Sequence, residues 1–469
     1  MLLERLNPAP ELRPAYNLGC LFDIPTGKYF IGAHGESIHS GGCTFVTGVA
    51  GVGNSFKTAI SDWHVLRVLD RYSSSNASVY DTELTKNIMR YYELAARFPS
   101  LAGRYLQDEG KLVLSDNAEK TGYTGNQYYD IIKSLLTDKA KDAKNVRTMP
   151  FLTLKDRKPI QTFFPTVSFI DSLSQFKTDS VIKMQDKADI GESERNMEAM
   201  RDGSAKTQMM IELGRIAASA SGLFILTAHV GTDYILDPYT PPKKKLAFLK
   251  NGLKLKNVPE KFTFLTNNCW FVTDTKPLIN QLTKAPEFPR NSDDDMRGDT
   301  DLMVLTLGSI RCKSGPTGIP FELIVSQSEG LLPGLSEFYY VKERGRYGLG
   351  GNDKNYFMEL LPEVSLSRTT VRNKIDHNAA LQRAITITSE MLQIEEYYHQ
   401  LPRDLICSPK QLYEDIKAKG YDWARLLKTR GYWIFEEDVD DNTLPFLSTM
   451  DLLNMRAGTY HPYWYGDLK

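Results

Sequence analysis

Cysteine is scarce in this chain of 469 residues, and the five cysteines lie far apart with no C-x-x-C pair. This spacing excludes a disulfide-stapled scaffold and indicates a reducing, intracellular setting. Histidine is also sparse, and none of the seven histidines falls at zinc-site spacing from another histidine or cysteine. Because the chain lacks both a signal segment and a run of about eighteen apolar residues, we expect a cytoplasmic protein with no membrane partner.

Charge of one sign is not in excess, because 57 Lys and Arg residues face 58 Asp and Glu residues and leave a net charge of −1. A histone-like protein is therefore excluded, and any contact with nucleic acid must be local. Hydrophobic residues make up 41% of the chain and charged residues 25%, which is typical of a folded globular protein. The length favours two or three domains, one of them large enough for a full α/β core.

Strand-like and helix-like segments alternate along most of the chain. This alternation predicts an α/β fold in which helices flank a mainly parallel sheet. The expected elements are strands at 43–47, 77–80, 166–170, 222–228, 269–273, 302–306 and 320–326, and helices at 56–72, 84–97 and 205–219.

Two smaller regions flank the predicted α/β core, which we expect to span residues 21–350. Residues 1–20 are broken by prolines and predict an N-terminal arm. Beyond residue 350, an expected helix at 370–400 and many aromatic residues predict a smaller, α-rich C-terminal domain over residues 351–469. The sequence of this domain does not indicate whether it binds duplex DNA, a loader protein or another partner.

The most informative stretch runs from Gly48 to Thr58, between a predicted strand and a predicted helix. Phosphate loops follow the pattern G-x-x-x-x-G-K-[ST], in which backbone N–H groups wrap the phosphates, the lysine neutralises them and the hydroxyl binds Mg²⁺. Lys57 and Thr58 fall at that spacing, whereas Phe56 replaces the second glycine. The alternative is a glycine-rich turn with an incidental Lys-Thr pair. The predicted phosphate-binding residues are Gly51, Val52, Gly53, Asn54, Ser55, Phe56, Lys57 and Thr58.

Polar side chains follow three other predicted strands. Asp171 is the candidate carboxylate for Mg²⁺, although an Asp at a strand end also serves as a turn or helix cap. Glu83 is favoured over Asp81 as the general base for the attacking water, because Asp81 is placed to cap the next helix. His229 is placed to sense the terminal phosphate, and its alternative role is that of a loop-facing histidine.

Together these residues resemble the RecA family of recombination ATPases, and most closely the UvsX-type recombinases of bacteriophages. In that phage group the loop also carries Phe-Lys in place of Gly-Lys, as at Phe56-Lys57. Asp81-Thr-Glu83 is similar to the family's Asp-x-Glu, whose last residue is catalytic, and Ile170-Asp171-Ser172 is similar to its magnesium strand. The resemblance covers roughly residues 21–340.

The resemblance implies a RecA-like ATPase that coats single-stranded DNA as a filament or ring and promotes homologous pairing and strand exchange. ATP and Mg²⁺ would lie between protomers, with Arg311 and Lys313 reaching the nucleotide of the neighbouring subunit. The alternative for this pair is two solvated surface cations. Accessory partners such as a phage loader or a single-strand-binding protein are also implied, in the cytoplasm of an infected bacterium.

Lysines are concentrated between His229 and the strand expected at 269–273. In the family, the second of two DNA-binding loops follows the sensor strand and therefore falls here. Such a cluster binds a phosphate backbone without reading sequence, and its alternative is a solvated loop. The predicted DNA contacts are Lys243, Lys244, Lys245, Lys250, Lys254 and Lys256.

Two other functions are compatible with these motifs. A hexameric replicative helicase of RecA fold would use the same ATP residues and would differ in unwinding DNA processively. An ATP-gated DNA-binding assembly protein would hold nucleotide without DNA-stimulated hydrolysis and without strand exchange.

Overall fold

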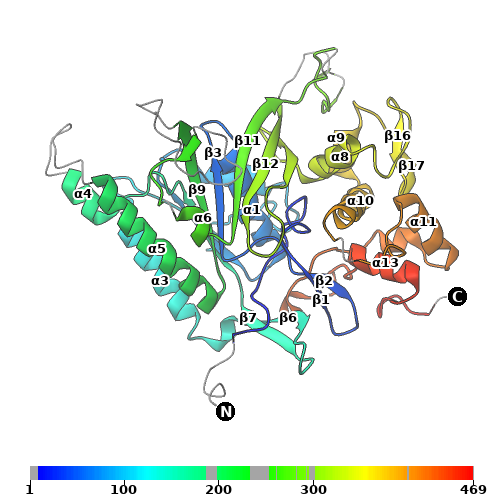
Figure 1. Cartoon of the computed structure of the whole chain (residues 1–469), viewed down its shortest axis with the longest axis horizontal. Helices are drawn as coiled ribbons and strands as arrows, with labels where there is room; N and C mark the ends of the chain where they lie inside the picture. The colour runs from blue at the N-terminus through cyan, green and yellow to red at the C-terminus, as the bar shows by residue number, and fades with distance from the viewer. Residues whose placement is uncertain are drawn as a thin grey trace, which may run out of the picture.

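The largest element of the protein is a ten-stranded central sheet (Figure 1). Its strands are β3 (Val46–Gly51), β4 (Asn76–Asp81), β5 (Leu112–Asp116), β8 (Thr166–Asp171), β9 (Gly222–Thr232), β10 (Leu253–Leu255), β11 (Asn268–Pro277), β12 (Leu302–Cys312), β13 (Pro320–Ser326) and β14 (Gly330–Leu331). They follow the order β14-β13-β12-β11-β3-β9-β8-β4-β5, and β10 pairs with β9 outside this path. The structure is a computed structural model that describes residues 9–185, 198–232, 253–259, 261–280, 283–291, 293–294, 301–398 and 401–467.

Strand direction divides the sheet into two parts. Every pairing from β5 to β11 is parallel, and the pairings from β11 through β12 and β13 to β14 are antiparallel. In the parallel part, β3 and β8 are buried at every residue, as expected for strands covered on both faces. The expectation of a mainly parallel sheet flanked by helices is confirmed.

Helices cover this sheet and connect its strands. The helix α1 (Lys57–Arg71) packs against β3, β4, β8 and β9, whereas α5 (Glu198–Ala220) packs against β3 and β9. A further helix, α3 (Gly125–Lys139), lies beside α5 (Figure 1). Smaller elements of this region are β1 (Tyr29–Ile31), β2 (Ser37–His39), α2 (Ile88–Ala95), β6 (Val146–Leu152), β7 (Pro159–Phe163), α4 (Asp179–Gln185) and α6 (Phe262–Leu265).

The chain after residue 331 forms helices and one small sheet. The sheet contains β15 (Leu349–Gly351), β16 (Tyr356–Met358) and β17 (Leu361–Leu366). The helices are α8 (Pro333–Glu343), α9 (Val371–His377), α10 (Ala379–Tyr397), α11 (Pro409–Ala418), α12 (Trp423–Leu426) and α13 (Thr449–Ala457). The single helix expected at 370–400 is wrong. Asn378 leaves helical geometry, with φ −128° and ψ 99°, and its side chain accepts a hydrogen bond from the Leu381 N–H, so α9 ends there and α10 begins.

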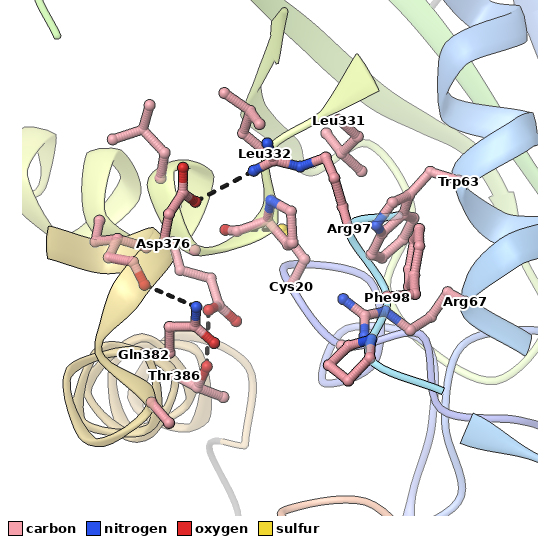
Figure 2. Close-up of a pocket in the computed structure, with 18 of the residues that line it drawn as sticks. Cys20, Trp63, Arg67, Arg97, Phe98, Leu331, Leu332, Asp376, Gln382 and Thr386 are labelled. Atoms are coloured by element: carbon pink, nitrogen blue, oxygen red, sulfur yellow. Dashed lines mark hydrogen bonds and ion pairs between the residues drawn. The ribbon is translucent and has the colours of Figure 1, made fainter. Parts of the chain in front are cut away.

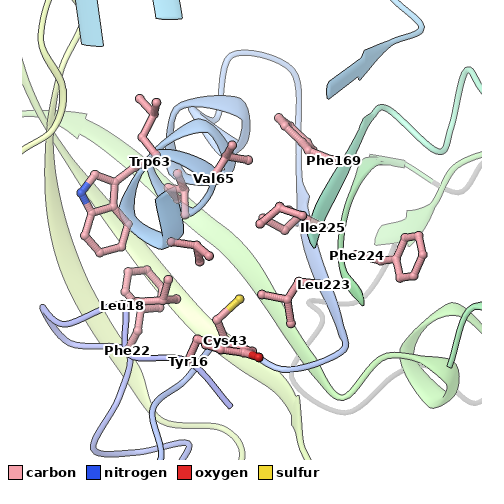
Figure 3. Packing of buried hydrophobic residues seen from close by; sticks show 14 of the residues in the cluster. Tyr16, Leu18, Phe22, Cys43, Trp63, Val65, Phe169, Leu223, Phe224 and Ile225 are labelled. Carbon is pink, nitrogen blue, oxygen red and sulfur yellow. The ribbon is translucent and has the colours of Figure 1, made fainter. Parts of the chain in front are cut away.

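The N-terminal and C-terminal segments share a hydrophobic core with α1. Figure 3 shows Tyr16, Leu18 and Phe22 gathered below Trp63 of that helix. The rings of Phe22 and Trp63 are 5.6 Å apart, and Tyr16 lies 5.4 Å from the ring of Trp433. The domain boundaries near residues 20 and 350 stay a prediction. No helix within the described ranges combines the length and the apolar character that crossing a membrane requires.

Candidate nucleotide site

The predicted site residues of the central sheet gather at one edge, where its parallel strands end. The strand expected at 43–47 lies further along the chain, because β3 runs from Val46 to Gly51 and contains the first four residues of the predicted phosphate-loop stretch. The rest of the loop follows β3, Glu83 follows β4 and Asp171 is the last residue of β8. The strand register aligns Gly51 with His229 on β9, and Asp81 with Asp171. This edge is where open α/β sheets bind their ligands, because the connecting loops and the helix N-termini meet there.

The loop between β3 and α1 has an unusual backbone. Asn54 and Phe56 are left-handed, with φ of 56° and 57°, and Phe56 directly precedes the first turn of α1. This conformation favours glycine and costs a residue with a side chain about 1–2 kcal/mol. Phe56 therefore has a backbone conformation that favours glycine, which is the residue at this position in the phosphate-loop pattern.

The N–H groups of this loop remain available to a ligand. Within the described residues, the backbone N–H groups from Gly53 to Phe56 donate no hydrogen bond to another part of the chain. The first N–H groups of α1 also lack intrahelical acceptors, as in any helix. A run of N–H groups that alternates with left-handed residues and leads into a helix N-terminus forms a concave site for an anion.

Lys57 places a cation at this loop. It is the first residue of α1 and is only 7% exposed. Burial lowers the pKa of Lys57, whereas the nearby carboxylates of Asp171 and Glu83 oppose that shift. A largely buried cation beside free N–H groups suits a phosphate group.

Asp171 is held by donors on both carboxylate oxygens. Its Oδ1 accepts a hydrogen bond of 2.6 Å from the Thr227 hydroxyl. Its Oδ2 lies 3.2 Å from the Lys86 ammonium, which is also 2.8 Å from Asp62 of α1. Burial lowers the pKa of Lys86, but these two carboxylates outweigh the effect and the pKa is raised overall. The Asp62–Lys86–Asp171 cluster thus fixes the side chain of Asp171.

The sequence analysis did not identify Lys86 or Asp62. A signal for Asp62 is its position four residues after Thr58, which places both side chains on the same face of α1. Asp62 is linked to Asp171 through Lys86, so Thr58 lies on the face of α1 that carries this cluster. The tertiary contact of α1 with the loop after β4 has no signature in the sequence.

The residues present suit a Mg²⁺ ion that is bound together with phosphate. Thr58 and Asp171 supply two oxygen-bearing side chains, and Mg²⁺ commonly takes only one or two protein ligands and completes its shell with phosphate and water. Across the described ranges, no three His, Cys, Asp or Glu side chains are grouped as a protein-only metal site requires. The predicted Thr58–Asp171 pair therefore fits a metal that arrives with nucleotide.

Glu83 is hydrogen-bonded to His229 across the strand ends. The His229 Nε2 lies 2.6 Å from a carboxylate oxygen of Glu83, and both side chains are partly exposed. This hydrogen bond is the main cause that lowers the pKa of Glu83 to about 2. The carboxylate of Asp81 accepts hydrogen bonds from the N–H groups of Glu83, Thr85 and Lys86, so Asp81 shapes the turn that carries Glu83.

Two of the predicted DNA-binding lysines lie close to His229. Lys254 is exposed on β10, opposite Gly231 of β9. The N–H of Lys256 donates a hydrogen bond of 2.8 Å to the carbonyl of His229. The segment that carries these lysines is therefore attached to the backbone of His229. Lys243, Lys244, Lys245 and Lys250 lie outside the described residues.

Arg311 and Lys313 lie away from this site within one chain. The antiparallel β12 aligns Cys312 with Asn268, which is level with Thr47 at the start of β3. Both cations are therefore at the opposite edge of the sheet from the loop that follows Gly51. The guanidinium of Arg311 lies 5.8 Å from the ring of Phe264, which is 62% exposed. Their action on a neighbouring subunit stays a prediction.

Comparison with known proteins adds no relative to this picture. No protein-family model matches the chain, and no curated protein matches it.

Proposed function

We propose that this chain is an ATP-dependent DNA recombinase of the RecA type, which binds single-stranded DNA and promotes homologous pairing and strand exchange. The observation that carries the proposal is the set of groups at one edge of the parallel sheet. A loop with free N–H groups, the buried cation of Lys57, the fixed carboxylate of Asp171 and the Glu83–His229 pair meet there. This set matches the requirements of nucleotide hydrolysis.

Each group has a chemical role in this proposal. The N–H groups of the loop and Lys57 hold the phosphates of ATP, and Thr58 and Asp171 hold Mg²⁺. When bound, Mg²⁺ neutralises charge on the phosphates and orients them. Glu83 positions the attacking water and accepts its proton.

The Glu83–His229 contact supports regulation of this base. A carboxylate with a pKa of about 2 is a weak proton acceptor. If His229 turns from Glu83 toward the terminal phosphate, Glu83 loses its strongest donor and becomes a stronger base. Because Lys256 is hydrogen-bonded to the His229 carbonyl, DNA bound by the lysines of this segment would act directly on that switch.

The test is ATP hydrolysis by the full chain with and without single-stranded DNA, with negative-stain imaging of the same samples. We expect turnover that DNA stimulates, together with helical filaments. Glu83→Gln should bind ATP but lose turnover, whereas the control Glu93→Gln, on the exposed face of α2, should hydrolyse ATP normally. Closed rings that unwind duplex DNA processively would instead indicate a helicase. Absence of both stimulation and assembly would contradict the recombinase proposal.

A further inference from the structure

A cavity lies beside α1 and extends from Ala59 to Arg71 in the last turn of that helix. It has a volume of about 680 Å³ and separates α1 and residues 96–99 from α9, α10 and residues 429–432. Figure 2 shows Trp63, Arg67 and Phe98 on one side, and Gln382 and Thr386 on the other. This volume is typical of a small-molecule site.

One end of the cavity is closed by ion pairs. Arg97 lies 2.6 Å from Glu329 and 3.2 Å from Asp376, and this second pair is drawn in Figure 2. Arg372, which is 3% exposed, lies 2.8 Å from the same Glu329. Each cation at this end therefore has a carboxylate partner, although the buried Nε–H group of Arg372 lacks an acceptor among the described residues.

The other end collects arginines whose charges are less well matched. Arg67 and Arg71 come from the last turns of α1, and Arg383 comes from α10. The Nε–H group of each of these arginines is buried and has no hydrogen-bond partner among the residues that the structure describes. Arg383 is 8% exposed, and its guanidinium group donates a hydrogen bond to the carbonyl of Leu447. Burial is the largest cause that lowers the pKa of Arg67 and of Arg383. The positive charge of Arg71 lowers the pKa of both groups further.

The carboxylates near these arginines are already engaged. Asp23 lies 3.9 Å from Arg71, and its oxygens accept hydrogen bonds from the N–H groups of Leu18, Gly19 and Gly42. Asp70 lies 3.1 Å from Arg67. A buried Nε–H donor on each of three guanidinium groups thus remains unsatisfied beside a cavity, which is costly unless an acceptor enters.

Two glutamates, Glu337 and Glu390, lie across the cavity. Glu337 is 3% exposed, and burial raises its pKa to about 8, although Thr386 donates a hydrogen bond to its carboxyl group. Burial also raises the pKa of Glu390, whereas Arg383 opposes that shift. At neutral pH, Glu337 is therefore mostly protonated and adds little negative charge beside the arginines.

We propose that this cavity binds a small molecule that carries a phosphate group, held by Arg71 and Arg383 with a further contact from Arg67. Guanidinium groups are planar donors that match the oxygens of phosphate and form pairs of parallel hydrogen bonds with them. The fourteen helical steps from Lys57 to Arg71 span about 21 Å, so this site is distinct from the nucleotide site. The inference does not depend on the proposed recombinase function.

The test is calorimetric titration of the full chain with inorganic pyrophosphate, in buffer without Mg²⁺. The Lys57→Ala variant removes the cation of the phosphate loop and should still bind one pyrophosphate. Adding Arg71→Gln to Lys57→Ala should weaken that binding roughly 10- to 100-fold, since one charge-assisted donor group is lost. Adding Arg71→Lys keeps the charge but loses the planar fork, and should weaken binding less.

The matched control is Arg104→Gln in the same background, because Arg104 is exposed and lies outside the cavity. It should bind pyrophosphate as tightly as Lys57→Ala alone. Circular dichroism identifies the variants that fold. Arg383→Gln tests the contribution of α10, on the opposite wall of the cavity from Arg71, to pyrophosphate binding. The proposal is wrong if Lys57→Ala binds no pyrophosphate, or if neither Arg71→Gln nor Arg383→Gln changes the affinity.

Discussion

Lys86 is buried between two carboxylates, and its removal gives a quantitative test of the site's architecture. Its side chain is 6% exposed and lies 2.8 Å from Asp62 and 3.2 Å from Asp171. Lys86→Met preserves the length of the side chain but leaves the two carboxylates without their shared cation. Breaking a buried ion pair from one side costs about 3–5 kcal/mol. We expect a loss near 3 kcal/mol, because Tyr91 and Thr227 still donate hydrogen bonds to the carboxylates.

Urea unfolding followed by circular dichroism measures this loss. The control is Lys410→Met. The Lys410 ammonium is 67% exposed and lies as far as 4.0 Å from Glu414, so its removal should leave the unfolding midpoint unchanged. Adding Asp62→Asn to Lys86→Met should restore part of the stability, because it removes one of the uncompensated charges. An unchanged midpoint in Lys86→Met would refute the ion cluster.

The stability difference should also depend on pH. Burial already raises the pKa of Asp62 above its ordinary value of 3.8, and loss of Lys86 removes the cation that opposes this shift. A carboxyl group with a raised native pKa favours the folded state below its unfolded pKa and loses that contribution as pH rises through the native pKa. The free energy of unfolding should therefore differ most between wild type and Lys86→Met at neutral pH, and this difference should become smaller on acidification. A difference independent of pH would contradict this explanation.

Three further predictions concern the loop between β3 and α1, the proposed general base Glu83 and the lysines at 243–245. Phe56→Gly should retain ATP affinity, because residue 56 has a left-handed backbone that glycine adopts readily. Phe56→Val should weaken ATP binding, because a β-branched side chain disfavours this conformation, and equal affinities of the two variants would contradict the loop geometry. His229→Ala should raise the pKa of Glu83 from about 2 toward its ordinary value of 4.5, and thereby reduce the stability that ionised Glu83 contributes above pH 4.5. An unshifted titration of Glu83 by NMR would disprove the contact. Neutralising the lysines at 243–245 should reduce the salt slope of single-stranded DNA binding by about 2, and an unchanged slope would leave these lysines solvated.

Several elements of the fold were predictable because local pattern and tertiary structure agree. The expected strands at 166–170 and 222–228 became β8 and β9, whose apolar residues are buried in the central sheet. The expected strand at 43–47 was displaced, because the small residues Gly48, Ala50 and Gly51 belong to β3 although they suggest a loop. The alternation of the expected strands with helices predicted the parallel pairings. The division of the expected helix at Asn378 was missed, because a single capping side chain decides it.

The candidate site also has features that the sequence predicts and features that it does not. Lys57, Asp171 and Glu83 follow strands of one parallel sheet, so their proximity follows from the topology. The contact of Lys86 with Asp62 depends on how the loop after β4 packs on α1, and no local pattern encodes it. The arginine cavity also lies between segments that are distant in sequence, and it becomes visible only when α1 and α10 are placed together.

The central claim is that the edge of the sheet beside Lys57 binds Mg-ATP, and equilibrium binding of ATP tests it most directly. Wild type and the exposed-site control Lys410→Ala should bind ATP in the presence of Mg²⁺ with equal affinity. Lys57→Ala should fold normally but lose detectable binding, because it removes the cation buried beside the phosphate loop. ATP binding by Lys57→Ala with unchanged affinity would contradict the account.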